Sequence, residues 1–258
     1  MRIAVVVAAV LIGSGGSSPP VSRAHVTGPS IPVDARRTTR ELPETFHREE
    51  PVVRARHDVR LLKFDHAYPR TIAANRPLVR HILERNEQDR RRFLREEERL
   101  LKEEGGTPPD PQWTRSISRR WVVTGANEPL VSLAHEDMIM PGAHPAFEYG
   151  TLIWDNRAGR PIDLAMLFAD WPAARRHIYA TYRRIAERQA YPLETLPEPH
   201  SQPAGLSGAI GGRFTHIRYF LGRYSSHAEG EYEIAVPIDA ALLRLAKPEY
   251  RDALAEGR

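Results

Sequence analysis

Two runs of alternating side chains, separated by a short turn, constrain the fold of this chain more than any other feature. Leu130–Met140 and Ala146–Asp155 each alternate between two sets of residues, which is the spacing of strands with two different faces. Between them, Pro141-Gly142-Ala143-His144-Pro145 leaves room only for a turn. Strands joined by a short turn run antiparallel, so the sequence predicts an antiparallel hairpin centred on these residues.

The two faces of the first predicted strand differ in chemistry. His135 and Asp137 share one face with apolar neighbours, while Glu136 points to the opposite face. After the second strand, Asp155–Arg160 forms a predicted reversal, in which Gly159 supplies the positive φ that such turns require. Together with a strand predicted just before them over Gln112–Thr124, these two strands predict an antiparallel meander.

The rest of the chain adds one long helix, one shorter helix and several strands. The long helix is predicted from Thr71 or Asn75 to Glu104, where Gly105 and Gly106 end it, and its non-apolar faces carry charges such as Glu87 and Arg91 that we interpret as a solvated surface. The other predicted elements are strands over Val52–Phe64, Gln112–Thr124, Phe214–Leu221 and Glu231–Val236, a helix capped by Asp170 and ending near Ala190, a loop over Pro192–Gly212, and helical pieces over Asp239–Leu245 and Glu249–Glu256.

This order of elements predicts an α+β fold. We expect a mostly antiparallel sheet with the long helix and a second helix packed on it, built as two small sub-domains or as one composite domain. The predicted boundaries are a signal peptide over 1–24, a flexible linker over 25–51, a strand, long helix and strand over 52–125, and a meander with its helix over 126–258.

The first residues predict export from the cytoplasm. A basic residue, Arg2, precedes an apolar run from Ile3 to Ile12, and small residues and prolines follow up to Ala24, which is the outline of a secretory signal peptide. The run is much shorter than the roughly 20 apolar residues that cross a bilayer. We therefore expect cleavage after Ala24, no integral membrane span afterwards, and a periplasmic or secreted bacterial protein. A buried N-terminal strand is the alternative.

Composition argues against a nucleic-acid partner. The formal net charge is +4 and the pI is about 9.5, but the basic residues are almost all arginine and are interleaved with acids along most of the chain. No basic stripe stands free of acids, as a nucleic-acid surface would require. The chain has no cysteine, so neither a disulfide nor a lipid-modified cysteine can form.

Several short motifs in order resemble a pair of extracytoplasmic domains found in RsiV-type anti-sigma factors and in the non-catalytic N-terminal part of PdaC-type peptidoglycan deacetylases. The matching segments are Tyr68-Pro69 before the long helix, Met140–His144, Asp155, Ala158–Arg160, Leu164–Phe168, Tyr219-Phe220, Ala228–Gly230 and Val236-Pro237. Pro141 replaces a glycine of the usual pattern, and Gly222–Ser225 replaces a Pro-Tyr-Glu run. The second domain of this pair is a domain of unknown function, so the resemblance implies a fold and a compartment.

Candidate binding residues lie in the opening stretch. His144 could present its ring at a strand end, and Gly142 and Tyr149 complete the candidate ligand-binding set. A metal bound by His144 with His135, Glu136 or Asp137 is conceivable, but no ligand spacing such as HExxH supports it. We therefore predict no metal and no cofactor.

Catalytic patterns are weak throughout. Glu136 and Glu148, on adjacent strands, suggest the two carboxylates of a glycosidase, whereas the segment around Ser207 is neither a nucleophile elbow nor a phosphate loop. We expect an exported, non-enzymatic cell-envelope binding or sensing protein whose ligand is peptidoglycan, an envelope protein or a lysozyme-like protein. The alternatives are an envelope glycan hydrolase that uses carboxylates or His144, and a structural envelope protein without a small ligand.

Overall fold

The computed structural model describes residues 52–59, 61–103, 105, 114–140, 146–189, 198–221 and 233–255. The predicted signal peptide, the predicted linker over 25–51 and the predicted turn over 141–145, which contains Gly142 and His144, lie outside these residues.

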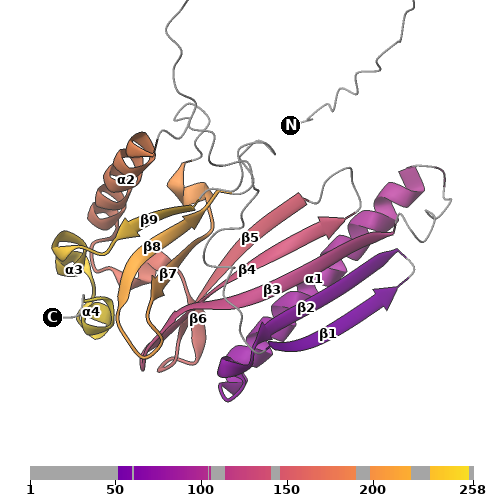
Figure 1. Ribbon diagram of the computed structural model, residues 1–258, viewed down its shortest axis with the longest axis horizontal. Helices are drawn as coiled ribbons and strands as arrows, with labels where there is room; N and C mark the ends of the chain where they lie inside the picture. Colours follow the sequence, from indigo (N-terminus) through magenta and orange to yellow (C-terminus); the bar gives the residue numbers. More distant parts are fainter. Residues whose placement is uncertain are drawn as a thin grey trace, which may run out of the picture. The chain divides into compact units, whose positions relative to one another are not determined.

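A six-stranded sheet forms the first layer of the fold (Figure 1). Its strands lie in sequence order and all neighbours are antiparallel except β2 and β3. The strands are β1 (Val52–Val59), β2 (Leu62–Pro69), β3 (Arg115–Ala126), β4 (Leu130–Met140), β5 (Ala146–Asp155) and β6 (Arg160–Ile162). The α+β fold with a mostly antiparallel sheet is confirmed. The domain boundary predicted after residue 125 falls within this sheet, at the end of β3.

The single strand predicted over Val52–Phe64 is wrong, because this segment is the first part of a hairpin. β1 and β2 pair along their whole length, with Val59 opposite Leu62. The two residues between these strands in the sequence include none of the glycine, asparagine or proline typical of hairpin turns. Without a turn signature, the alternation of β1 runs on into β2 and resembles one strand.

The long helix α1 (Arg76–Glu103) connects β2 to β3 and packs on one face of the sheet. A crossover of this kind is what parallel pairing between β2 and β3 requires. The Oδ1 atom of Asn75 accepts a hydrogen bond from the backbone N–H of Leu78 at 3.2 Å, so one of the two predicted starting residues does cap the helix. Figure 1 shows α1 running behind the strands.

A second sheet lies against the other face. It contains β7 (Ala204–Gly208), β8 (Phe214–Phe220) and β9 (Glu233–Pro237) and is covered by α2 (Trp171–Arg188), α3 (Ala240–Leu245) and α4 (Pro248–Leu254). The predicted cap of α2 is confirmed, since the side chain of Asp170 accepts a hydrogen bond from the N–H of Ala173 at 3.0 Å. A short 3-10 helix, Leu164–Leu167, precedes α2.

The loop predicted over Pro192–Gly212 is also wrong in part, because it contains a 3-10 helix, Pro199–Ser201, and the strand β7. Tertiary contacts hold β7 in place: Thr124 and Thr151 donate side-chain hydrogen bonds to the carbonyls of Leu206 and Ala204 at 2.5 and 2.9 Å. These partners lie far away in the sequence, so local glycine and proline content predicts a loop where long-range bonds build a strand.

Candidate functional site

A band of polar side chains crosses the interface between α1 and the first sheet. The band consists of Asn86, Asp89, Arg119, His135 and Asp137. Along the inward face of β3, Ile117 is followed by Arg119 and then Trp121, and on β4 His135 and Asp137 lie between Leu133 and Ile139. The band separates two apolar clusters, one around Ile82 and Trp121 and the other around Phe64 and Phe93. Polar groups in such a position must satisfy one another, since water cannot reach them.

Arg119 is the centre of this band. Its Nε and Nη2 atoms donate to the two carboxylate oxygens of Asp137 at 2.7 and 2.6 Å, and its Nη1 atom donates to Asp89 at 2.7 Å. Burial alone lowers the pKa of Arg119, but the hydrogen bonds and charges of Asp137 and Asp89 outweigh burial and raise that pKa above its ordinary value. The guanidinium therefore stays charged between two carboxylates.

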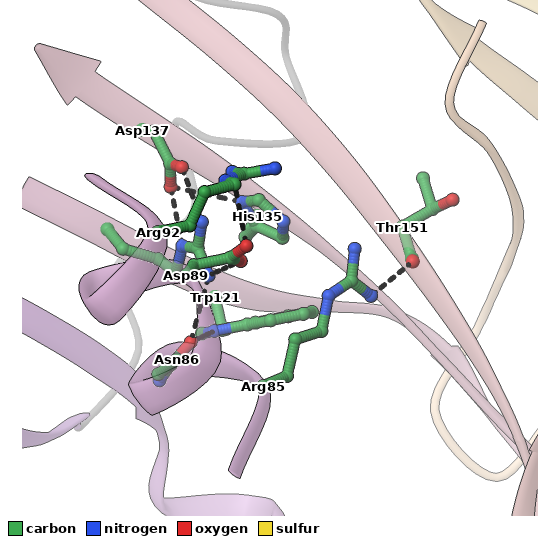
Figure 2. Close-up of polar contacts among 9 residues, drawn as sticks. Arg85, Asn86, Asp89, Arg92, Trp121, His135, Asp137 and Thr151 are labelled. Atoms are coloured by element: carbon green, nitrogen blue, oxygen red, sulfur yellow. Dashed lines mark hydrogen bonds and ion pairs between the residues drawn. The ribbon is translucent and has the colours of Figure 1, made fainter. Parts of the chain in front are cut away.

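Asn86 joins the helix to the sheet within the same band. Its Oδ1 atom accepts hydrogen bonds from Nη1 of Arg119 at 3.2 Å and from the indole N–H of Trp121 at 3.1 Å. Figure 2 shows Asn86 and Asp89 directed from α1 toward the strands. Asn86 follows Ile82 by four residues and precedes Phe93 by seven, so helical spacing turns it to the buried side.

His135 is held in place by a carboxylate and by the lack of a side chain opposite it. Its Nδ1 atom lies 3.1 Å from Oδ1 of Asp137, and Gly150 is directly across from it on β5. A Cβ atom at Gly150 would overlap the His135 ring. Burial lowers the pKa of His135 to about 4 against the effect of Asp137, so the ring is neutral at pH 7.

The band is closed to substrates. Arg119 and Asp137 are each 2% exposed and His135 is 5% exposed. A catalytic acid, base or nucleophile has to reach its substrate, and these groups reach only one another. We therefore assign the band a structural role.

A cavity of about 460 Å³ lies beside the band and does reach solvent. It is lined by His81 and Arg85 of α1, by Thr151–Ile153 of β5, by Arg160–Leu164 and by Ala204 at the start of β7. Arg160 and Asp163 in this lining are exposed. Its size falls within the usual range of small-ligand sites, about 300–1,000 Å³.

Arg85 connects the cavity with the band. Its Nη1 atom donates to the carbonyl oxygen of Thr151 at 3.1 Å, and its guanidinium lies over the ring of Trp121, 5.5 Å from the ring centroid. In Figure 2 the dashed line from Arg85 leads to Thr151. Burial, followed by the charge of Arg119, lowers the pKa of Arg85 below its ordinary value.

The residues predicted from the sequence are not brought together at this cavity. Tyr149 lies opposite Glu136 on the face away from α1 and stacks against Phe220, with the ring centroids 5.8 Å apart. Gly142 and His144 lie outside the described residues.

Glu136 and Glu148, which the sequence suggested as the two carboxylates of a glycosidase, do not lie on the same face of the sheet. Glu136 pairs with Tyr149, whereas Glu148 pairs with Asp137, and directly opposite residues share a face of the sheet. Glu136 and Glu148 therefore project from opposite faces. His135 and Asp137 share a face that excludes Glu136, as predicted.

Sequence reasoning missed Arg85, Asn86 and Arg119. Asn86 and Arg119 each occupy a position that the local period assigns to a buried face, Asn86 in line with Ile82 on α1 and Arg119 between Ile117 and Trp121 on β3. That conflict between period and polarity is the signal that could have identified them. Arg85 is only half-buried, and its place at the cavity depends on β5 and β6.

In the described ranges no group of three or more potential metal ligands occurs. Likewise, none of the helices in these ranges is long and apolar enough to cross a membrane.

Comparison with known proteins gives similarities in structure alone. No protein-family model matches the chain, and no curated protein matches it. The crystal structure of a DUF3298 family protein from Pseudomonas aeruginosa is similar over 81% of this chain and 96% of that chain, with 14% identity and a TM-score of 0.47. That of a DUF3298 family member from Bacteroides fragilis is similar over 74% and 90%, respectively, with 14% identity and a TM-score of 0.42.

Proposed function

We propose that this chain is an exported, non-enzymatic binding protein of the bacterial cell envelope and that the cavity beside Arg85 holds its ligand. The observation that carries the proposal is the contrast between the two polar sites. The band around Arg119 is closed, whereas the cavity is open to solvent and has a half-buried cation in its wall. A cavity with a few placed polar groups is the usual form of a ligand site.

Peptidoglycan is the ligand that we propose first. The predicted signal peptide would place the protein outside the cytoplasm, and the motif resemblance stated above implies a cell-envelope setting. A fragment of a peptidoglycan strand with its stem peptide is long enough to place one end in a cavity of about 460 Å³ while the remainder stays outside. A lysozyme-like protein is another candidate ligand in the cell envelope, and it is tested in parallel.

Catalysis has less support. The carboxylates suggested for hydrolysis lie on opposite faces of the sheet, and the buried His135 is neutral, held against Asp137 and closed to solvent. Neither arrangement offers a general acid and a base on the two sides of one bond, which glycoside hydrolysis requires.

Co-sedimentation with purified peptidoglycan tests the proposal. We expect the mature chain to sediment with peptidoglycan, and Arg85→Gln to weaken this binding. Arg80→Gln is the matched control, because Arg80 is an exposed arginine on the same helix and is not part of the cavity lining. If the protein binds neither peptidoglycan nor a lysozyme-type protein, the proposal is overturned. Release of soluble glycan fragments would identify an enzyme instead.

A further inference from the structure

The two carboxylates whose charges act on Arg85, Asp89 and Asp137, already form ion pairs with other arginines. Both oxygens of Asp137 accept hydrogen bonds from Arg119. Asp89 places one oxygen 2.7 Å from Nη1 of Arg119 and the other 3.1 Å from Nη2 of Arg92. These acids therefore balance the charges of Arg119 and Arg92.

Arg85 is left with a positive charge that no described residue balances by an ion pair. It donates a hydrogen bond to the neutral carbonyl of Thr151 and lies over the face of Trp121. A guanidinium has five N–H donors, so most of those of Arg85 remain available. A half-buried cation without a counter-charge is costly, and a bound anion would lower that cost.

The other charged groups around the cavity keep its balance positive. Arg160 and Asp163 both contribute to the lining and are exposed, so they add one charge of each sign and leave the net balance to Arg85. Burial, and then the charge of Arg85, lowers the pKa of His81, so its ring is neutral at pH 7. Arg85 thus supplies the net positive charge of the cavity.

We propose that the cavity binds its ligand through a carboxylate group, which Arg85 holds and Arg160 assists. This inference rests on the proposed function in naming the cavity as the ligand site, and it adds the chemical group that the cavity recognises. The planar guanidinium of Arg85 can offer two parallel N–H groups to the two oxygens of a carboxylate. A lysine lacks this fork and provides only a point charge.

Comparing a dipeptide with its C-terminal amide isolates the contribution of the ligand's carboxylate charge to binding. N-acetyl-alanyl-alanine ends in a free carboxylate, and its C-terminal amide has nearly the same shape without the charge. Both are titrated into the isotope-labelled protein, and the backbone amide signals of Thr151, Leu152 and Ile153 are followed by NMR. We expect saturable shifts with the acid and binding of the amide that is at least about tenfold weaker.

Variants test which residues carry the effect. Arg85→Gln is expected to remove the preference for the acid, Arg85→Lys to retain part of it, and Arg160→Gln to weaken acid binding while Arg80→Gln leaves it unchanged. The spectrum of each variant shows whether it folds, and the comparison of acid with amide in the unmodified protein needs no variant at all.

Each result favours or refutes one proposal. Equal affinity for acid and amide, or no shifts at Thr151–Ile153 with either, would overturn the carboxylate site even if the protein sediments with peptidoglycan. Acid-specific shifts in a protein that binds neither peptidoglycan nor a lysozyme-type protein would support the carboxylate site and refute the envelope function.

Discussion

Arg119 and Asp137 lie directly opposite each other on β3 and β4, and their side chains form an ion pair with two hydrogen bonds beneath α1. Each is 2% exposed. Such a pair is weak evidence for high stability, because the loss of hydration offsets much of the attraction. Breaking it, however, leaves a buried charge that has lost its main partner, and this loss is strongly destabilising.

Asp137→Asn keeps the shape of the side chain and removes its charge. We expect the free energy of unfolding to fall by about 3–5 kcal/mol, because Arg119 then remains buried with Asp89 as its only acidic partner. Urea denaturation followed by circular dichroism measures the change. Glu103→Gln breaks the exposed Arg99–Glu103 pair and should cost less than about 1 kcal/mol. Similar losses in the two variants would contradict this account of the band.

Gly150→Ala tests the close contact between β5 and His135. The added methyl group overlaps the ring, so we expect a loss of about 1–3 kcal/mol in the free energy of unfolding. In the His135→Ala background the same change meets no ring and should cost clearly less. A double-mutant cycle measures this coupling, and additive effects of the two changes would show that the ring and Gly150 do not compete for space.

Stability should fall when the pH is lowered from about 6.5 to about 4. His135 has a pKa of about 4 in the folded protein and about 6.5 when unfolded. Between these values the unfolded chain binds the extra proton, so acid favours unfolding, by up to about 3 kcal/mol for this group. His66 is also buried, and neither of its ring nitrogens is hydrogen-bonded to a described residue. Burial lowers the pKa of His66 as well, so this ring adds to the trend.

The pH effect is measured by urea denaturation across this range. His135→Gln removes one of the rings whose pKa is lowered by burial and should flatten the dependence. An unchanged slope in His135→Gln would mean that the ring is already accessible to protons in the folded protein.

Tyr250→Phe tests the link between α4 and the turn after β5. The hydroxyl of Tyr250 donates to Oδ2 of Asp155 at 2.5 Å, and the same carboxylate accepts from the backbone N–H groups of Arg157 and Ala158. We expect a loss of about 1–3 kcal/mol in thermal or urea unfolding, as for hydrogen bonds to charged groups. Tyr179→Phe is the control, because the buried Tyr179 hydroxyl has no hydrogen-bond partner among the described residues, and its removal should cost little.

The sequence predicts well the elements whose apolar and polar residues recur at regular spacing. β4 and β5 have the predicted bounds, since their alternation is regular and a proline-rich turn separates them. α1 agrees with prediction because its apolar stripe and its cap are both local. The reversal between β1 and β2 and the strand β7 were missed because the information is not local. The first hairpin lacks a turn signature, and β7 depends on Thr124 and Thr151.

The candidate site was beyond sequence reasoning for a related reason. On α1, Asn86 and Asp89 are embedded among charged residues such as Glu87 and Arg91, and only their phase relative to Ile82 turns them inward. The solvated surface predicted for this charge run holds for Glu87 and Arg91, which form an exposed i, i+4 pair. The cavity brings together residues from α1, β5, β6 and β7, so no window of sequence contains it.

The measurement that tests the central claim most directly is hydrogen–deuterium exchange of the mature protein with and without soluble peptidoglycan fragments. If this claim holds, exchange is slower at the cavity lining, in the peptides that cover 81–85, 151–153 and 160–164, with no such change in Arg85→Gln. Protection confined to other parts of the chain, or protection of the lining that persists undiminished in Arg85→Gln, would contradict it.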